Sequence, residues 1–378
     1  MQIRRHAYAP VTTDGRYLMG LISLAVRDFR NIAEGELAFS PHVNVITGSN
    51  GAGKTSVLEA LFFLGRAQSF RTTHTANLIR EGAHALLVTG KLKDRYDTEI
   101  PFGIERDKAS ARVHMAGKPV RQLSELVAHF PFQLLNPDSH QFLEGGPRHR
   151  RRFLDWGVFH VEPSFFPTWQ RYSRALRQRN AALRAGAPAQ EIRLWDPELI
   201  ATTEILDQQR RLYIEKLLPV LAGYLGELVD IDGLSWDYRP GWSQKLGYGE
   251  ALSETLEGDR RQGFTRNGPH RADLVATLEG LPAQERVSRG QQKQIVVALM
   301  LAQARVFRQE QGRACLFLID DLASELDSDH RARVLTQLKE VQAQIFLTAI
   351  NAADIDTSIW PDQRQFHVEH GQIEEVIY

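Results

Sequence analysis

The first third of the chain alternates apolar and polar residues with the period of two that is typical of β-strands. The alternation predicts strands at 21–26, 36–39, 86–92 and 98–105, and a hairpin at 112–118 that turns at Ala116-Gly117-Lys118. One stretch has helical spacing instead, because its apolar residues fall on one face of a helix over 55–64. A β-branched segment at 43–47 predicts a strand that leads into this helix.

The middle of the chain has the pattern of long amphipathic helices. The clearest are predicted at 171–184 and 203–228, separated by the helix-breaking segment AGAP at 185–188. From about residue 264 the types alternate again, with a helix at 291–310, a buried strand at 315–319, a helix at 330–340 and a strand at 344–350. The pattern predicts an α/β unit that is split in sequence by a mostly helical insertion, without a long coiled coil.

These changes of pattern predict the domain organisation. The 378 residues, of which 43% are apolar and 24% charged, suffice for two or three folding units. Residues 1–18 show no periodicity and are expected to be a disordered extension, with Met19 as the functional start. Residues 19–121 and 264–378 are expected to form lobe I, and residues 122–263 the helical lobe II.

Composition narrows the function before any motif is considered. Basic and acidic residues both number 46, so the chain is not a globally basic nucleic-acid binder, and such a role needs local charge segregation. The single cysteine, Cys315, excludes a disulfide framework and a zinc finger within the chain, and it fits a reducing compartment. No apolar run approaches the roughly 18 residues that span a bilayer. We therefore expect a cytoplasmic protein without a membrane partner.

The strongest motif is GSNGAGKT (48–55), which fits the phosphate-binding loop pattern. Its glycines allow successive N–H groups to turn toward one anion, and the following helix adds its positive end. Lys54 is expected to reach the β- and γ-phosphates of ATP, and Thr55 to coordinate Mg²⁺. The alternative is a glycine-rich turn without a ligand, but the strand before it and the helix after it favour nucleotide binding. The residues predicted to contact ATP here are Gly48, Ser49, Asn50, Gly51, Ala52, Gly53, Lys54, Thr55 and Ser56.

Two carboxylates follow a buried strand in CLFLIDD (315–321). Asp320 and Asp321 stand at its carboxyl end, the edge at which open α/β sheets bind ligands. Asp320 is predicted to hold Mg²⁺, and Asp321 to orient or deprotonate the attacking water. Alone, such a pair is equally well explained as a turn or cap, and the phosphate loop favours the catalytic interpretation. Asp320 lies 266 positions after Lys54, much further than in small GTPases and nucleotide kinases.

A third motif, SRGQQ (288–292), opens the long helix of the last third. Ser288 is a good N-cap, and Gly290 leaves the backbone open to a ligand. With Arg289 and Gln291, these residues form a second predicted anion site at a helix N-terminus. Since one active site does not need two, we expect the motif to bind the γ-phosphate held by another copy, with ATP at a twofold homodimer interface. The alternative is an ordinary capped helix, which also applies to SELD (324–327).

Charge is segregated along the chain. Residues 145–184 hold nine arginines against Asp155 and Glu162, whereas residues 351–378 hold six acids against one arginine. An arginine-rich face suits DNA phosphates and implies little sequence preference. The alternative for residues 150–152 is structural pairing with acids of the helical lobe. The predicted DNA-binding residues are Arg150, Arg171, Arg174, Arg177 and Arg184.

Taken together, the motifs resemble those of the ABC-type ATPase heads shared with SMC proteins and, more closely, those of the RecF family of bacterial recombination mediators. The resemblance rests on RDFRN (27–31), GSNGAGKTSVLEAL (48–61), GRAQSFRT (65–72), GGPRHRRRFLDW (145–156), RQRNAAL (177–183), GPHRADL (268–274), SRGQQK (288–293) and IDDLASELD (319–327). The chain departs from most ABC heads at its N-terminal extension and in having Asp-Asp where they have Asp-Glu, which suits slow hydrolysis.

The resemblance implies a fold and further site residues. The fold would be a P-loop ATPase head with a mixed sheet and an antiparallel β lobe, joined to a mostly helical second lobe. Arg30 and Asn31 would lie near the adenine or ribose. Gln133 would be the Q-loop residue that senses the metal and the γ-phosphate, and Thr348 would stand where ABC transporters carry a switch histidine. A buried loop contact is the alternative for Gln133 and Thr348.

The resemblance also implies a function. The protein would be a weak, DNA-stimulated ATPase of recombinational repair and replication-fork maintenance, associated with the nucleoid. ATP would drive homodimerisation that clamps double-stranded or gapped DNA, slow hydrolysis would release it, and RecO and RecR would join it in helping RecA to load. Two other classes remain open: an ATPase subunit of a membrane transporter, and a DNA-processing nuclease with an ABC-like head. A nuclease would need a second metal site, but the sequence shows no further cluster of carboxylates or histidines. His270 is the only nearby candidate, and its alternative is to support the loop before the SRGQQ motif or to contact the nucleotide.

Overall fold

The fold is taken from a computed structural model of the chain, which describes residues 20–94 and 96–376. The predicted extension at 1–18 and the proposed start at Met19 lie outside the described residues. By its contacts the chain divides into two compact units, which are described separately. Of the described residues, unit 1 comprises 20–94, 96–132, 308–320 and 339–376, and unit 2 comprises 133–307 and 321–338.

Unit 1 contains an antiparallel sheet in the order β2-β1-β4-β5-β6-β7. Its strands are β1 (Gly20–Phe29), β2 (Ile32–Ala38), β4 (Ala85–Lys93), β5 (Glu99–Asp107), β6 (Ala111–Met115) and β7 (Lys118–Pro119). Side chains of β4 alternate between buried and more exposed, as the period of two predicts. The predicted turn is confirmed, because Ala116 and Gly117 both have positive φ and Met115 pairs with Lys118.

The second sheet of unit 1 carries the predicted phosphate loop. Its order is β15-β14-β3-β13-β12, in which β14, β3, β13 and β12 run parallel and β15 pairs antiparallel with β14. The strands are β3 (Val43–Thr47), β12 (Leu316–Ile319), β13 (Gln344–Ala349), β14 (Gln363–Glu369) and β15 (Gln372–Val376). Each residue of β3, β12 and β13 is buried, as continuous apolar runs predict.

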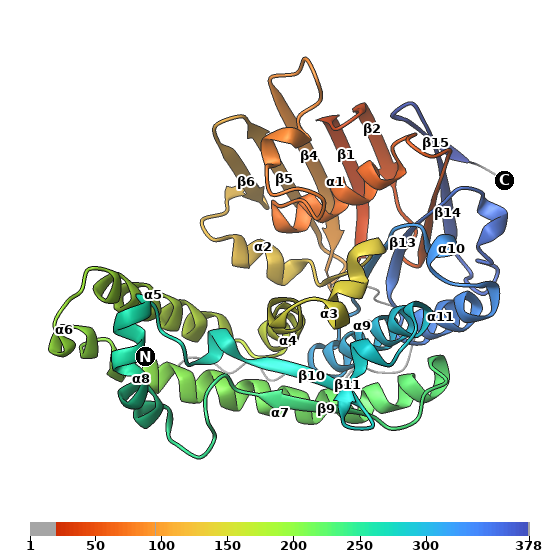
Figure 1. Cartoon of the computed structure of the whole chain (residues 1–378). Helices are drawn as coiled ribbons and strands as arrows, with labels where there is room; N and C mark the ends of the chain where they lie inside the picture. Colours follow the sequence, from red (N-terminus) through yellow and green to blue (C-terminus); the bar gives the residue numbers. More distant parts are fainter. Residues whose placement is uncertain (1–19, 95, 377–378) are drawn as a thin grey trace. The chain divides into compact units, whose positions relative to one another are not determined.

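Helix α1 (Lys54–Arg66) packs against both sheets of unit 1, as Figure 1 also shows. Its buried face includes Val57, Leu58, Leu61 and Leu64, the residues that predicted it. The remaining elements of unit 1 are η1 (Thr75–Leu78), α2 (Leu123–His129) and η5 (Ala352–Asp354). Strand β8 (Phe132–Leu135) has its first residue in unit 1 and the others in unit 2.

Unit 2 is mainly helical, as predicted for the middle of the chain. Its helices are η2 (Pro137–His140), α3 (Gln141–Glu144), α4 (Pro147–Val161), α5 (Phe165–Arg184), α6 (Ala189–Arg193), α7 (Asp196–Leu228), α8 (Tyr248–Gln262), η3 (Pro269–Arg271), η4 (Ala283–Glu285), α9 (Arg289–Gln311), α10 (Leu322–Glu325) and α11 (Ser328–Glu340), of which α9 and α11 end in unit 1. Helices α5 and α7 begin earlier than predicted, and the AGAP segment separates α5 from α6.

Unit 2 also has a small antiparallel sheet in the order β11-β10-β9. Its strands are β9 (Leu234–Arg239), β10 (Asp273–Leu278) and β11 (Leu281–Pro282). The contacts place residues 264–307 and 321–338 in unit 2, whereas the sequence analysis assigned them to lobe I, and they place residues 122–132, expected in lobe II, in unit 1. One physical reason is that Phe307 on α9 packs with Trp156 and His160 of α4. The assignment of functional lobes stays a prediction. No helix in the described part of the chain is long and apolar enough to cross a membrane.

Candidate functional site

The phosphate loop in unit 1 is built from backbone that only glycine adopts readily. Gly48, Gly51 and Gly53 have φ of 147°, 83° and 123°. A Cβ on Gly48 would lie 2.3 Å from the carbonyl oxygen of Val368, whereas a Cβ on Gly51 would have no neighbour within 4 Å. The loop is therefore tightly held at its start and open at its middle, where Ser49, Asn50 and Gly51 are exposed.

Lys54 holds the loop in a curl from within. Its Nζ donates hydrogen bonds to the carbonyl oxygens of Gly48 at 2.8 Å and Ser49 at 3.0 Å. The first turn of α1 has no acidic residue, and no side chain caps its N-terminus. The positive end of the helix and its N–H groups thus face the loop without a competing anion, which is the chemistry that binds phosphate.

Two of the predicted metal-binding residues, Thr55 and Asp320, lie together at the carboxyl end of the parallel strands, whereas the third, Gln133, belongs to unit 2. Thr55 Oγ1 lies 3.0 and 3.1 Å from the two carboxylate oxygens of Asp320. Thr348 Oγ1, fully buried at the end of β13, donates to Asp320 Oδ1 at 2.8 Å. These three oxygen-bearing side chains fit a hard cation such as Mg²⁺, which prefers oxygen ligands and is usually held by a carboxylate, a hydroxyl and phosphate.

Arg30 and Asn31 form the turn between β1 and β2, and they contact α1 and the loop. The Arg30 guanidinium donates to both carboxylate oxygens of Glu59, at 2.8 and 2.9 Å, and Glu59 is fully buried in α1. Asn31 donates to the carbonyl oxygen of Ala52 at 3.0 Å and accepts from Ser56 Oγ at 2.9 Å. Their proximity to an adenine or ribose stays a prediction. The sequence analysis missed Glu59, although an acid on the apolar face of a helix predicts a buried partner.

The residues of the SRGQQ motif belong to unit 2, at the start of α9. Ser288 and Gln291 cap the helix reciprocally: the Ser288 N–H donates to Gln291 Oε1 at 2.9 Å, and the Gln291 N–H donates to Ser288 Oγ at 3.3 Å. The cap leaves Ser288, Arg289 and Gly290 exposed. The arrangement fits the capped-helix alternative and also leaves this helix end accessible to a ligand.

Gln133 and Asp321 also belong to unit 2 by their contacts. Gln133 is 5% exposed and donates to Gln303 Oε1 of α9 at 3.1 Å, while Gln303 donates to the Phe153 carbonyl oxygen of α4 at 2.8 Å. This is the buried contact that was left as the alternative. Asp321 follows Asp320 directly, in the left-handed backbone conformation with φ of 58°.

Several arginines of segment 145–184 are structural. The guanidinium of Arg150 donates to both carboxylate oxygens of Asp273 at 2.7 and 3.0 Å and to the Gly145 carbonyl oxygen at 2.8 Å. Arg151 donates to the Ala272 carbonyl oxygen at 2.7 Å. The basic motif of α4 thus anchors the GPHRADL motif, and for Arg150 the structure favours the structural alternative over DNA contact.

The exposed face of α5 carries the other predicted DNA-binding arginines. Its buried face repeats with helical spacing and includes Tyr172, Ala175 and Arg179, so the opposite face presents exposed Arg171, Arg174, Arg177 and Arg184. Arg171 ion-pairs with Glu198 at 2.8 Å. Arg174, Arg177 and Arg184 form no ion pair with any acidic residue in the described part of the chain.

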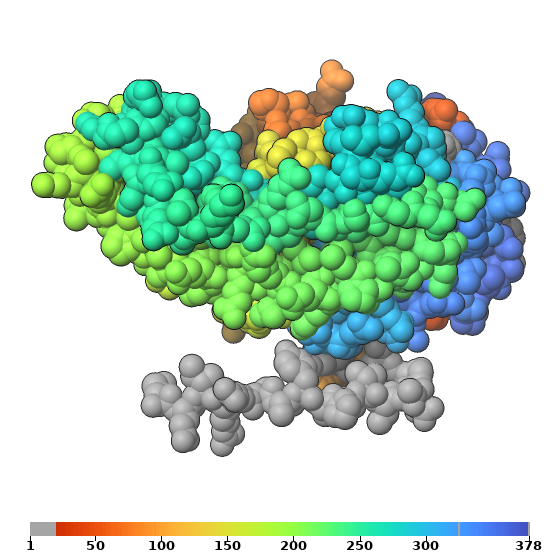
Figure 2. Space-filling model, turned by 60° about the horizontal axis from the view of Figure 1, so that its bottom comes forward, coloured from red at the N-terminus to blue at the C-terminus, as the bar shows by residue number. Residues whose placement is uncertain are grey.

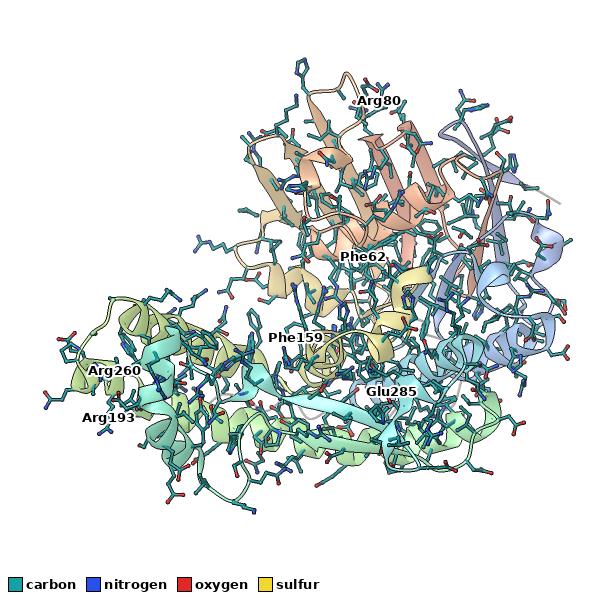
Figure 3. All side chains as sticks on the ribbon, viewed as in Figure 1. Phe62, Arg80, Phe159, Arg193, Arg260 and Glu285 are labelled. Atoms are coloured by element: carbon teal, nitrogen blue, oxygen red, sulfur yellow. The ribbon has the colours of Figure 1, made fainter. Side chains whose placement is uncertain are left out.

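Further cationic side chains lie on unit 2 outside α5. Helices α5, α6 and α8 form one end of unit 2, and Arg193 of α6 and Arg260 of α8 lie at this end (Figure 3). The surfaces of α6 and α8 adjoin at the same end in Figure 2. A hollow of about 690 Å³ is lined by Arg239, Lys245 and Arg271. The sequence analysis did not single out these residues, because they come from separate segments.

His270 is part of a partly buried polar cluster in unit 2. Tyr172 Oη lies 2.5 Å from His270 Nδ1, and His270 Nε2 lies 3.1 Å from the Thr265 carbonyl oxygen. Because the carbonyl can only accept, Nε2 carries the proton and Nδ1 accepts from the tyrosine. Burial lowers the pKa of His270 to about 4. Among the described residues, no three His, Cys, Asp or Glu side chains form a group that could hold a metal ion.

Comparison with known proteins identifies the family. A model of the RecF/RecN/SMC N-terminal domain matches residues 20–370. The DNA replication and repair protein RecF of Edwardsiella ictaluri is 39% identical over 356 residues, which cover 94% of this chain and 99% of that protein. The chain belongs to the RecF family. The RecF protein of Escherichia coli O1:K1 has the same identity and coverage, so the predicted relationship is confirmed.

Solved structures agree with the fold. A structure titled as the recombination mediator protein RecF-ATPrS in the RecFOR pathway matches with a TM-score of 0.85 at 24% identity, and the match covers 95% of this chain and 99% of that one. An Smc head bound to the C-terminal winged-helix domain of ScpA matches with a TM-score of 0.56 at 15% identity, over 94% of this chain and 97% of that one. The predicted fold class, an SMC-like ATPase head of the ABC type with a mostly helical second part, is confirmed.

Proposed function

We propose that this protein is an ATP-dependent DNA-binding protein of recombinational repair, in which ATP closes a homodimer on double-stranded or gapped DNA. The observation that carries the proposal is the phosphate loop, in which the Lys54 curl and the uncapped N-terminus of α1 adjoin the Thr55–Asp320 pair. Family membership adds support, since the relatives are named as DNA replication and repair proteins and one of the similar solved structures is of RecF with ATP.

Each residue of the loop has a defined part in this proposal. The backbone N–H groups of the exposed residues 49–51 bind the phosphates, and Lys54 balances the phosphate charge while it holds the loop carbonyl oxygens. Thr55 and Asp320 supply oxygen ligands for Mg²⁺, and Thr348 fixes the orientation of the Asp320 carboxylate. When bound, Mg²⁺ would neutralise developing charge on the phosphates. Asp321 orients the attacking water, and its short side chain suits slow hydrolysis.

The proposed dimer uses the exposed residues at the start of α9. Ser288, Arg289 and Gly290 present a helix N-terminus to solvent, which suits the γ-phosphate held by a second copy. Light scattering with and without ATP tests this step. We expect a doubled mass with ATP, and a monomer in both conditions would exclude the role of α9.

The proposed DNA surface is the arginine face of α5. Arg174, Arg177 and Arg184 are exposed and without an acidic partner among the described residues, so their charge is available to phosphates. With RecO and RecR as partners, as the family implies, the loaded dimer would help RecA to assemble at single-stranded gaps.

A gel-shift assay with a gapped duplex tests the whole proposal. Lys54→Ala should abolish ATP-dependent retention of the DNA, because the variant loses both the phosphate charge partner and the loop curl. Lys91→Ala is the matched control, since Lys91 is exposed in the same unit and pairs only with Glu99 among the described residues. ATP-dependent retention by Lys54→Ala at the wild-type level would be incompatible with the proposal.

A further inference from the structure

Two tight turns of unit 1, far apart in sequence, meet at the phosphate loop. The first is Arg30-Asn31, between β1 and β2. The second is His370-Gly371, which joins β14 to β15 through the pair Glu369 and Gln372. Both residues of the second turn have positive φ, 49° and 80°, the signature of the tightest hairpin connection.

Both turns hold the same atom of the loop. The carbonyl oxygen of Ala52 accepts a hydrogen bond from the Gly371 N–H at 2.9 Å and another from Asn31 Nδ2 at 3.0 Å. Ala52 itself is buried, with 5% of its surface exposed. The orientation of the Ala52–Gly53 peptide is therefore set from outside the loop.

A fixed carbonyl also fixes the next N–H group. In a planar trans peptide the C=O and N–H bonds point in opposite directions. Because the Ala52 oxygen is held toward the two turns, the Gly53 N–H points away from them, at the point where α1 begins. That N–H is one of the unpaired donors of the helix N-terminus that bind an anion.

The contact has no room for a side chain. A Cβ on Gly371 would lie 2.1 Å from the carbonyl oxygen of Asn31, and a Cβ on Gly48 would lie 2.3 Å from the carbonyl oxygen of Val368, which precedes the same turn. The hairpin of β14 and β15 thus contacts the loop at its first glycine and near its end.

We propose that the C-terminal hairpin is a working part of the nucleotide site, and that Gly371 and Asn31 are positioning residues that aim the Gly53 N–H at the bound phosphate. The proposal deepens the proposed function and rests on nucleotide binding by the loop. It explains why a glycine stands in the hairpin turn at the point where the Asn31 backbone approaches.

The variant Gly371→Ala tests the proposal, with Gly82→Ala as its matched control. Both glycines lie in unit 1 with nearly equal φ, 80° and 83°, but a Cβ on Gly82 would meet nothing within 4 Å. Backbone strain is thus nearly equal, and only Gly371→Ala forces a Cβ against the Asn31 carbonyl oxygen, which pushes apart the two turns that hold the Ala52 oxygen. Calorimetric titration with the non-hydrolysed analogue ATPγS should give a Kd about tenfold weaker for Gly371→Ala than for Gly82→Ala.

Hydrogen–deuterium exchange without nucleotide gives an independent readout. Peptides covering residues 48–56 should exchange faster in Gly371→Ala than in the control, because the Ala52 peptide has lost a partner. Equal exchange and equal Kd in the two variants would overturn the proposal. If the wild-type protein failed to bind ATPγS, the proposed function would be refuted. The exchange experiment would still test the hairpin, since faster exchange in Gly371→Ala would show that the hairpin holds the loop and equal exchange would show that it does not.

Asn31→Ala keeps the test sharp if Gly371→Ala does not fold. This variant removes one donor to the Ala52 oxygen and introduces no clash. It should weaken ATPγS binding in the same direction, at temperatures where its far-UV circular dichroism matches that of the wild type. Unchanged ATPγS binding and unchanged exchange at residues 48–56 would refute the role of Asn31 and, with it, the proposal that the two turns position the loop.

Discussion

Arg177 and Arg179 are two residues apart on α5, and the structure predicts opposite consequences for their replacement. Arg179 is fully buried and donates to Asp196 at 2.9 Å, to Asp259 at 2.9 Å and to Thr265 Oγ1 at 2.8 Å. Arg177 is exposed, with no ion pair among the described residues. We therefore expect Arg179→Met to destabilise unit 2, and Arg177→Met to leave its stability unchanged.

The magnitude follows from the partners that remain. Breaking a buried ion pair costs about 3–5 kcal/mol, because it leaves the other charge buried without compensation. Asp259 is fully buried but still accepts from the Arg266 guanidinium at 3.2 Å, so the cost should fall near the lower limit, about 3 kcal/mol. For a unit of this size that corresponds to a fall in Tm of about 6–12 °C. Arg177→Met should change stability by less than about 0.5 kcal/mol.

Tryptophan fluorescence during thermal unfolding is the assay. Of the six tryptophans only Trp360 belongs to unit 1, so the signal reports mainly on unit 2. Equal Tm values for the two variants would refute the assignment of Arg179 to a structural role. A DNA titration completes the comparison: Arg177→Met should lower affinity and reduce the salt slope by about 1. An unchanged slope would remove Arg177 from the proposed DNA surface.

Three further predictions concern other positions. Burial lowers the pKa of His270 from 6.5 to about 4, so between these two values the folded state binds fewer protons than the unfolded state. About 3 kcal/mol of the free energy of unfolding, present in full above pH 6.5, is therefore lost as the pH falls toward 4. His270→Gln should flatten this dependence, which Tm measured at neutral pH and at about pH 4.5 will show; parallel curves would contradict it. Gly157→Ala should destabilise the protein by about 1–3 kcal/mol despite its helical position, because the Cβ would lie 2.1 Å from the Tyr213 ring. Gly223→Ala, whose Cβ would have nothing within 4 Å, should stabilise it by about 0.5–1 kcal/mol. Urea unfolding measures both changes, and the same sign for both would argue against the close packing of Gly157 on Tyr213. Glu59→Gln should cost about 2 kcal/mol in urea unfolding, since Arg30 loses its bidentate partner but stays partly hydrated; a neutral result would count against that ion pair.

The local elements of the site could be predicted from the sequence because their causes are local. The run of buried β-branched residues, the glycines of the loop and the apolar face of α1 lie within 24 consecutive residues, 43–66. Strand β9 was missed although LSWDYR alternates with a period of two. The surrounding helical pattern determined the interpretation of that region, and only pairing with β10 identifies it as a strand.

The fates of the arginines could not be predicted from the sequence. Arg150, Arg177 and Arg179 occur in one basic segment. Arg150 and Arg179 stabilise unit 2 because they pair with acids at positions 273, 196 and 259, whereas Arg177 is exposed to solvent. Charge in a sequence is a property of composition, whereas its availability to a ligand depends on which acids the fold brings near.

The sequence by itself determined the family, the phosphate loop and the carboxylate strand, because short motifs with obligatory backbone geometry leave a readable trace. The sequence already predicted that Thr55 and Asp320 hold one metal ion, but tertiary structure alone decided that Thr348 donates to Asp320 and that Gly371 lies against Ala52. The physical reason is that parallel strands align their carboxyl ends whatever the length of chain between them, and that a hydrogen bond between distant turns depends on the register of two sheets, which local residues do not encode.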